Sequence, residues 1–174
     1  MTKKKGVVWV STVLYILISL AIIGIVIAAL TPRINSAKDK ATIEQTMIML
    51  NSLDSTILQV NQVQGTKLEN NFKMARGLLT IDANKNEISW QLDNSAYKYS
   101  EPGVLVTVGN IGAYTEQSQA GWKVTLTMEY NNMDIKFNNT DSEHILQPAE
   151  TPYKLWIENK GSVHEMNQID LSVS

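Results

Sequence analysis

The chain has no cysteine and only two histidines among its 174 residues. Without cysteine it can form no disulfide, no thiolate nucleophile and no cysteine-ligated metal site. It also lacks an excess of positive charge, since 15 Lys and Arg stand against 17 Asp and Glu. Proteins that neutralise nucleic-acid phosphates carry a basic surface, so no nucleic-acid partner is expected. The length suits one domain, with or without an appendage, stabilised by packing alone.

Apolar residues are concentrated near the start of the chain. Residues 7–30 contain no charged side chain, and the uncharged stretch continues to Pro32. As a helix this segment is about 36 Å long, which exceeds the roughly 30 Å hydrocarbon thickness of a bilayer. A core helix of a soluble protein is the alternative, but such helices rarely stay apolar on every face. The segment is therefore predicted to lie in a membrane at some stage.

The short sequence before this segment, MTKKKG, places three lysines directly ahead of the apolar run. Lysines in this position favour a cytoplasmic N-terminus, with everything after residue 30 outside the cell. An ordinary secretory signal has an apolar region of only about 7 to 15 residues. Conventional cleavage near Ala28 and Ala29 remains an alternative, although the apolar run is too long for that pattern.

Residues 33–64 show a different, amphipathic pattern. Gaps of three and four residues place the apolar side chains on one helical face, and Gly65 is a plausible stop. Pro32 marks a possible kink. The residues on the apolar face are Ile43, Met47, Leu50, Leu53, Ile57 and Val60.

The remaining chain, residues 68–174, has the two-residue period of half-buried strands. The strongest case is 122–130, and Asn131-Asn132 predicts a hairpin to a second strand at 133–137. Further strands are expected at 78–81, 87–92, 104–108, 153–158 and 168–173, with turns at 83–86, 102–103 and 159–161. The expected fold class is α+β, a long N-terminal hydrophobic helix followed by an antiparallel β-sandwich-like head.

A lysine-rich leader ending in Gly6, a long apolar helix, an amphipathic extension and a β-rich head together resemble the precursor of a type IV pilin. The resemblance implies that a prepilin peptidase recognises Lys5, Gly6 and Val7 and cuts after Gly6. Residues 1–6 would then be a removed leader. The mature helix would anchor the subunit in the membrane until assembly machinery extracts it into a filament of identical subunits.

The resemblance also implies that residues 7–32 form the filament core while the heads form its surface. The residues expected to pack there are Val10, Leu14, Leu17, Ala21, Gly24, Ile25 and Ala28. Removing the leader deletes three lysines that would otherwise enter this apolar core, where unpaired charge is costly. Gly24 marks a place where the helix loosens or a neighbour approaches closely.

Two features depart from bacterial pilins. Ser11 occupies the fifth mature position, where bacterial major pilins usually carry glutamate, and there is no cysteine pair for a C-terminal disulfide loop. Both make the chain more similar to archaeal pilins and archaellins, and of these an adhesion-type pilin is favoured. Two other classes stay open: an uncleaved single-pass membrane protein with a binding head, and a low-copy minor pilin or pseudopilin.

Residues that could carry chemistry are sparse in the head. His144 and His164 have no neighbouring ligand cluster, and no phosphate-binding loop or nucleophile elbow occurs. Asp82, Asn84 and Asn86 imitate a calcium loop, but Glu87 stands where such a loop needs glycine, so a hairpin turn is expected. No enzyme activity, metal or cofactor is therefore predicted. Asn138 begins an Asn-Asn-Thr sequon and is a candidate for N-glycosylation.

Overall fold

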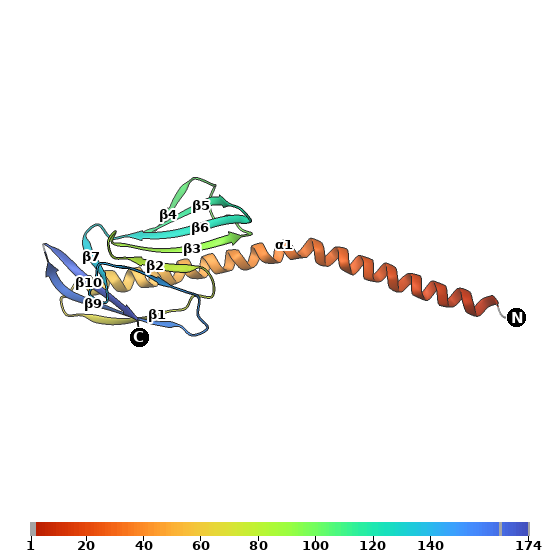
Figure 1. Ribbon diagram of the computed structural model, residues 1–174, viewed down its shortest axis with the longest axis horizontal. Coiled ribbons are helices and arrows are strands. Elements are labelled where there is room, and N and C mark those ends of the chain that lie inside the picture. The colour runs from red at the N-terminus through yellow and green to blue at the C-terminus, as the bar shows by residue number, and fades with distance from the viewer. Residues whose placement is uncertain (1–2, 164, 174) are drawn as a thin grey trace.

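The fold is seen in a computed structural model that describes the backbone at residues 3–163 and 165–173, and side chains at residues 9–162 and 165–173. It begins with one long helix, α1 (Lys3–Asn61), that contains Pro32. Figure 1 shows the N-terminal half of α1 projecting away from the head, with a bend near its middle. A proline within a helix removes one backbone hydrogen bond and crowds the preceding turn, which accounts for a bend there.

In the part of the chain that the structure describes, ten strands follow and form two sheets. One has four strands in the order β1-β9-β10-β7, and the other has six in the order β4-β5-β6-β3-β2-β8. The strands are β1 (Lys67–Phe72), β2 (Leu78–Asp82), β3 (Glu87–Ser95), β4 (Leu105–Val108), β5 (Ile111–Ser118), β6 (Gly121–Glu129), β7 (Met133–Phe137), β8 (Glu143–Leu146), β9 (Tyr153–Val163) and β10 (Met166–Val173). The expected α+β class is confirmed, with a long N-terminal helix and an antiparallel-rich head.

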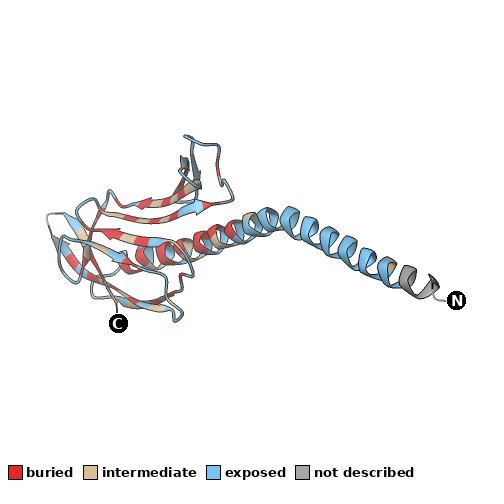
Figure 2. Ribbon diagram, turned by 45° about the vertical axis from the view of Figure 1, so that its right-hand side comes forward, coloured by how far each residue is buried: buried red, intermediate tan, exposed pale blue. Residues whose placement is uncertain are grey.

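The C-terminal half of α1 lies between the two sheets (Figure 1). One continuous core unites the helix with both sheets, so the helix is part of the head's interior. The six residues predicted to form the apolar face of this half are all buried, and that prediction is confirmed. Figure 2 shows the change along α1, from exposed throughout the N-terminal half to an alternation of buried, intermediate and exposed residues inside the head.

Several local predictions from the sequence are confirmed. Residues 83–86 form the turn between β2 and β3, which pair as an antiparallel hairpin. The backbone N–H of Asn84 donates to Asp82 Oδ1 at 3.1 Å, and Asn86 adopts a positive φ of 53°. An Asx turn of this kind is a common way to connect two strands. In β6, alternate residues Val124, Leu126 and Met128 are buried as the two-residue period requires.

The predicted hairpin at Asn131-Asn132 is wrong. The chain leaves the six-stranded sheet at β6 and enters the four-stranded sheet at β7, which pairs in parallel with β10. The residues on both strands keep the predicted alternation, because each strand turns one face to the shared core. Alternation thus predicted the strands, but not which strands pair.

The predicted turn at 159–161 is also wrong, because β9 runs through these residues. Gly161 has a φ of 98°, and the register of β9 against β10 shifts between Gln168 and Ile169. A bulge lets a strand absorb residues that look like a turn in the sequence. Strands β1, β5 and β8 were not predicted, since their sequences contain many polar or small residues.

The sequence predicts that the three tryptophans of the head, Trp90, Trp122 and Trp156, fill its core. Trp90 is fully buried, and its indole Nε1 donates to the carbonyl of Arg76 at 3.1 Å. Trp122 and Trp156 are only half-buried, so the prediction is wrong for these two residues. The Lys67 ammonium lies over the ring of Trp156, 5.4 Å from its centroid, so part of this ring takes up a cation–π contact.

Candidate functional site

The most prominent surface is the projecting part of α1, residues 9–30, which we call the apolar segment. Fifteen large apolar side chains in it are exposed, from Trp9 at 77% to Leu30 at 47%. They occupy every face of the helix (Figure 2), and no part of the head covers them. The helix from Trp9 to Asn61 holds a stretch long and apolar enough to cross a membrane.

The free energy of exposing this segment to water decides what its surroundings must be. Removing one large aliphatic side chain from water gains roughly 1.5 to 3 kcal/mol, so fifteen amount to tens of kcal/mol. A folded domain is stabilised by only about 5 to 15 kcal/mol in total. The apolar segment therefore requires an apolar environment, which lipid or other protein helices supply.

The seven residues predicted to pack in a filament core lie on one broad face of the apolar segment. Most follow each other at three- and four-residue spacing, and the adjacent residues Gly24 and Ile25 lie at the two edges of that face. Val10 and Ile25 are each 69% exposed, and the other five are exposed as well. A Cβ built on Gly24 meets no atom within 4 Å. With Ala28 four residues later, Gly24 allows a neighbouring helix to approach closely. The structure thus brings these residues together and leaves their face unpartnered within the chain.

Two hydroxyl groups, one in the apolar segment and one next to it, are satisfied by the helix itself. Ser19 Oγ donates to the carbonyl of Tyr15 at 2.8 Å, and Thr31 Oγ1 donates to the carbonyl of Ile27 at 2.8 Å. Such bonds remove the cost of burying a hydroxyl in an apolar medium. Both side chains are therefore compatible with burial in lipid or in a helical assembly.

Buried polar contacts attach the second half of α1 to the head, beginning at Asp39. Asp39 is 4% exposed, forms an ion pair with Arg76, and accepts a hydrogen bond from the backbone N–H of Ala96 at 2.7 Å. At the other end, Asn159 Nδ2 donates to the carbonyl of Val60 at 3.1 Å, and Asn167 Nδ2 donates to the carbonyl of Asn61 at 3.0 Å. These side chains satisfy carbonyls that the end of a helix leaves unpaired.

A third contact lies between these two, at Asp54. Its Oδ1 accepts hydrogen bonds from Tyr130 Oη and Asn110 Nδ2, each at 2.9 Å. Burial of the phenol, followed by the nearby charge of Asp54, raises the pKa of Tyr130 well above its usual value of 10.0. Tyr130 therefore stays protonated at neutral pH and keeps donating its hydrogen bond to Asp54 at the helix–head junction.

Replacing Tyr130 with Phe tests this contact. The unfolded chain releases the phenolic proton near pH 10 while the folded chain retains it, so the contribution is complete below pH 10 and lost as pH rises further. At pH 7 we expect Tyr130→Phe to lower the free energy of unfolding by about 1 to 3 kcal/mol. The difference should shrink above pH 10. Urea unfolding of the full chain in detergent, followed by circular dichroism, measures it; a pH-independent difference would contradict the assignment.

The residues of the predicted processing site lie at the start of α1. The backbone of Lys5, Gly6 and Val7 is helical, while their side-chain environment lies outside the described residues. Their role in processing stays a prediction.

The head offers little that could perform chemistry. Among the residues that the structure describes, no group of three or more His, Asp or Glu side chains is placed to hold a metal ion. His144 lies in β8, half-buried, with its ring stacked on Phe137 at 3.9 Å between centroids. The sequence predicts a solvated loop or strand histidine here; His144 does lie in a strand, but its ring is half-buried and stacked. His164 lies outside the described residues.

Asn138 is exposed in a tight two-residue turn at the end of β7. Asn138 and Asn139 have φ values of 51° and 59°, and Phe137 and Thr140 pair through backbone hydrogen bonds on either side. Asparagine tolerates such positive φ values better than other side chains. The sequon is therefore presented on the surface, as a glycosylation site requires.

We predict that Asn138 carries a glycan on material exported to the cell surface. Intact-mass measurement should then give a value above the sequence mass, and Asn138→Gln should remove the excess. Asn132→Gln, in an exposed turn outside any sequon, serves as the matched control. Identical masses for wild type and Asn138→Gln, apart from the substitution itself, would contradict the prediction.

One exposed apolar surface was not predicted from the sequence. Strand β4 is at an edge of the six-stranded sheet, and all four of its residues are exposed, among them Leu105 at 64%. An uncharged stretch from residue 102 to 115 was the available signal. Edge strands without charge are prone to pair with other chains.

Comparisons with protein-family models, with curated proteins and with solved structures find no match for this chain. What the chain does must therefore be inferred from its own residues and fold.

Proposed function

We propose that this chain is a structural subunit, a pilin, of an extracellular filament resembling a type IV pilus. The observation that carries the proposal is the apolar segment, which is exposed on every face and continuous with the helix of the head. In a single subunit, membrane lipid supplies the apolar environment that this segment requires. In a filament, the apolar segments of neighbouring subunits supply that environment to one another.

The arrangement of the head supports assembly through the helix. The second half of α1 is held in the core by Asp39, Asp54 and Asn61 contacts, so a force on the apolar segment is transmitted to the head. Most of the exposed large apolar residues lie on the projecting helix, whereas the apolar residues of the head are mainly in its buried core. Subunits packed through their helices would display heads outward, where β-rich surfaces serve adhesion.

Before assembly, the precursor is proposed to sit in the cell membrane with its lysines on the cytoplasmic side. A prepilin peptidase then removes residues 1–6, and assembly machinery extracts the mature chain. No cofactor or metal enters this function. The partner of the mature protein is a second copy of itself, repeated in a helical array.

An uncleaved membrane-anchored binding protein is a second candidate function, and the exposed edge strand β4 is the observation that favours it. An apolar strand edge accepts an extended peptide by adding it as a new strand. This candidate predicts a retained leader and no polymer.

A low-copy minor pilin is a further alternative. It would share the removal of residues 1–6 with the proposed subunit but would be present in far fewer copies.

Shearing the cell surface and imaging the released material by electron microscopy tests the proposal. We expect filaments that contain this chain as the main component by gel and peptide mass spectrometry. The chain appearing only in membranes, with no filament in the sheared fraction, would contradict it.

A further inference from the structure

The outer side of α1 within the head carries an unusual surface. Between residues 45 and 61 the only charged residue is Asp54, which is buried. The exposed positions of this part are Gln45, Ile48, Ser52, Ser55, Leu58 and Gln59, and we call them the uncharged face. Ile48 is 69% exposed, the highest value among the large apolar residues outside the apolar segment. Along residues 33–61 of α1, the exposed charged residues all lie at 33–44.

Hydroxyl groups along this part of α1 resemble those of the apolar segment in their bonding. Thr46 Oγ1 donates to the carbonyl of Thr42 at 2.9 Å, and Ser55 Oγ donates to the carbonyl of Asn51 at 2.8 Å. Thr42 and Thr56 make the same bond to the residue four positions earlier. Each donor is thus satisfied within the helix, so these side chains can be covered by apolar groups without losing a hydrogen bond to water.

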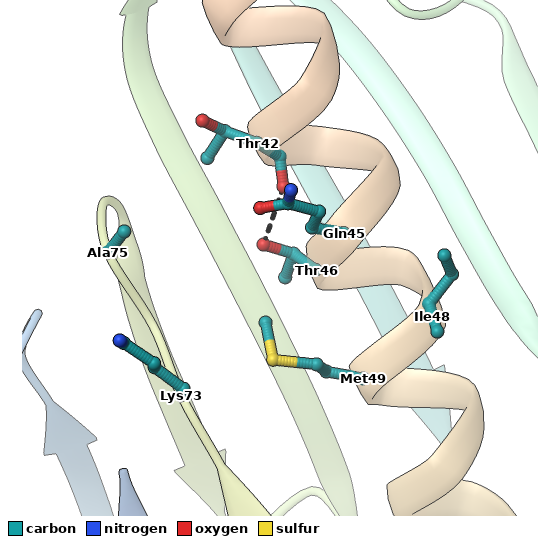
Figure 3. Close-up of a pocket in the computed structure, with 7 residues that line it drawn as sticks. All are labelled: Thr42, Gln45, Thr46, Ile48, Met49, Lys73 and Ala75. Atoms are coloured by element: carbon teal, nitrogen blue, oxygen red, sulfur yellow. Dashed lines mark hydrogen bonds between the residues drawn. The ribbon is translucent and has the colours of Figure 1, made fainter. Parts of the chain in front are cut away.

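A groove of about 490 Å³ runs beside this face, between α1 and the segment that links β1 to β2. Figure 3 shows Thr42, Gln45, Thr46 and Met49 on the side of α1 that faces Lys73 and Ala75, whereas Ile48 extends from the other side of the helix in this view. Ile48 also contributes to the lining of the groove. The dashed bond from Thr46 turns its hydroxyl toward the helix backbone. The groove is therefore lined mainly by methyl groups, the Met49 thioether and Ala75.

We propose that the uncharged face and this groove receive the apolar segment of a second copy of the chain. The inference rests on the proposed function and names where one subunit's helix meets its neighbour's head. We infer the occupant from the match between two exposed surfaces of the described chain. The apolar segment must be covered, and the uncharged face is a helical surface that can cover it without burying a charge. Lys73 at the rim keeps its ammonium in water while its aliphatic stem contacts the occupant.

The lengths of the two surfaces define a stagger between neighbouring subunits. The uncharged face is centred near residue 52 and the apolar segment near residue 20. Parallel helices that place these centres together are offset by about 32 residues, or roughly 48 Å at 1.5 Å per residue. Ile48 of one subunit then lies near Ile16 of the next.

Cysteine cross-linking in assembled filaments tests this placement, because the chain has no cysteine of its own. Ile48→Cys is combined in turn with Val13→Cys, Ile16→Cys, Leu20→Cys and Ile23→Cys, and sheared filaments are oxidised. We expect a ladder of disulfide-linked oligomers for at least one of these pairs. Leu78→Cys, which is 39% exposed in β2 and outside the groove, replaces Ile48→Cys in the matched control and should give no ladder.

The inference would be overturned if the Ile48→Cys pairs form filaments at wild-type yield but give no more disulfide-linked oligomers than the Leu78→Cys controls. That result would leave the proposed function intact. Failure of the wild-type chain to form any filament would instead overturn the proposed function. A second variant, Ala75→Trp, fills the groove and should lower filament yield at least tenfold at an unchanged membrane level. Ala120→Trp, at an exposed turn outside this groove, should leave the yield near wild type; equal yields for the two variants would also overturn the inference.

Discussion

Replacing Ile25 with Asp is expected to abolish filaments while the head stays folded. Ile25 lies on the face of the apolar segment predicted to pack between subunits, and it is 69% exposed in the single chain. In a packed helical core an unpaired carboxylate costs several kcal/mol, and every subunit repeats that cost. A cost of about 3 kcal/mol per subunit is more than 100-fold in an association constant. The filament content of the sheared fraction, measured against the membrane level of the chain, gives the result.

The control for Ile25→Asp must distinguish a defect in filament assembly from a defect in membrane insertion. A carboxylate at the centre of a membrane helix costs about 2.5 to 3.5 kcal/mol during insertion, so Ile25→Asp is compared at equal membrane levels. Gly24→Leu provides a second variant, because leucine inserts well but fills the space that a neighbouring helix would enter. We expect Gly24→Leu to lower filament yield and Ile22→Val to leave it unchanged. Normal filaments from both Ile25→Asp and Gly24→Leu would show that this face does not form the core.

Replacing Gly6 with Leu is expected to retain the leader and to prevent assembly. The resemblance to type IV pilins places the cut after Gly6, and a bulky side chain there should block the peptidase. The retained leader keeps three lysines at the end of the apolar segment, where they would have to enter an apolar core. N-terminal peptide mass spectrometry of the membrane fraction should find residues 1–6 still attached.

Lys4→Gln is the matched control, because it changes the leader but leaves residues 5–7 intact. We expect this variant to be processed and assembled. A Gly6→Leu chain that still forms filaments beginning at residue 7 would mean that processing does not depend on Gly6. The uncleaved membrane-anchor alternative predicts no difference between the two variants.

The long helix and its two environments could be predicted from the sequence, because period and charge are local properties. A run without charge predicted the projecting part, and apolar residues at three- and four-residue spacing predicted the buried face from Ile43 to Val60. Strong alternation likewise predicted β3 and β6. The candidate packing face needed no tertiary information, since helix geometry alone places Val10 and Ala28 on one side.

Tertiary pairing could not be predicted in the same way. The path from β6 to β7 crosses between sheets, and two asparagines after a strand are equally compatible with a hairpin or a crossover. The contact of Asp54 with Tyr130 joins residues 76 positions apart, and no local pattern indicates it. The groove beside Met49 depends on where the segment after β1 is placed, so the only indication in the sequence was the scarcity of charge between residues 45 and 61, where Asp54 is the single charged residue.

The most direct test of the account is the N-terminus of the chain in filaments sheared from the cell surface. Intact-protein and N-terminal peptide mass spectrometry of that fraction would measure it. The account predicts an abundant chain that begins at Val7, with the lysines of the leader removed. An intact leader at Met1, found only in membranes, would contradict the account and identify the β-rich head as the binding part of an anchored protein.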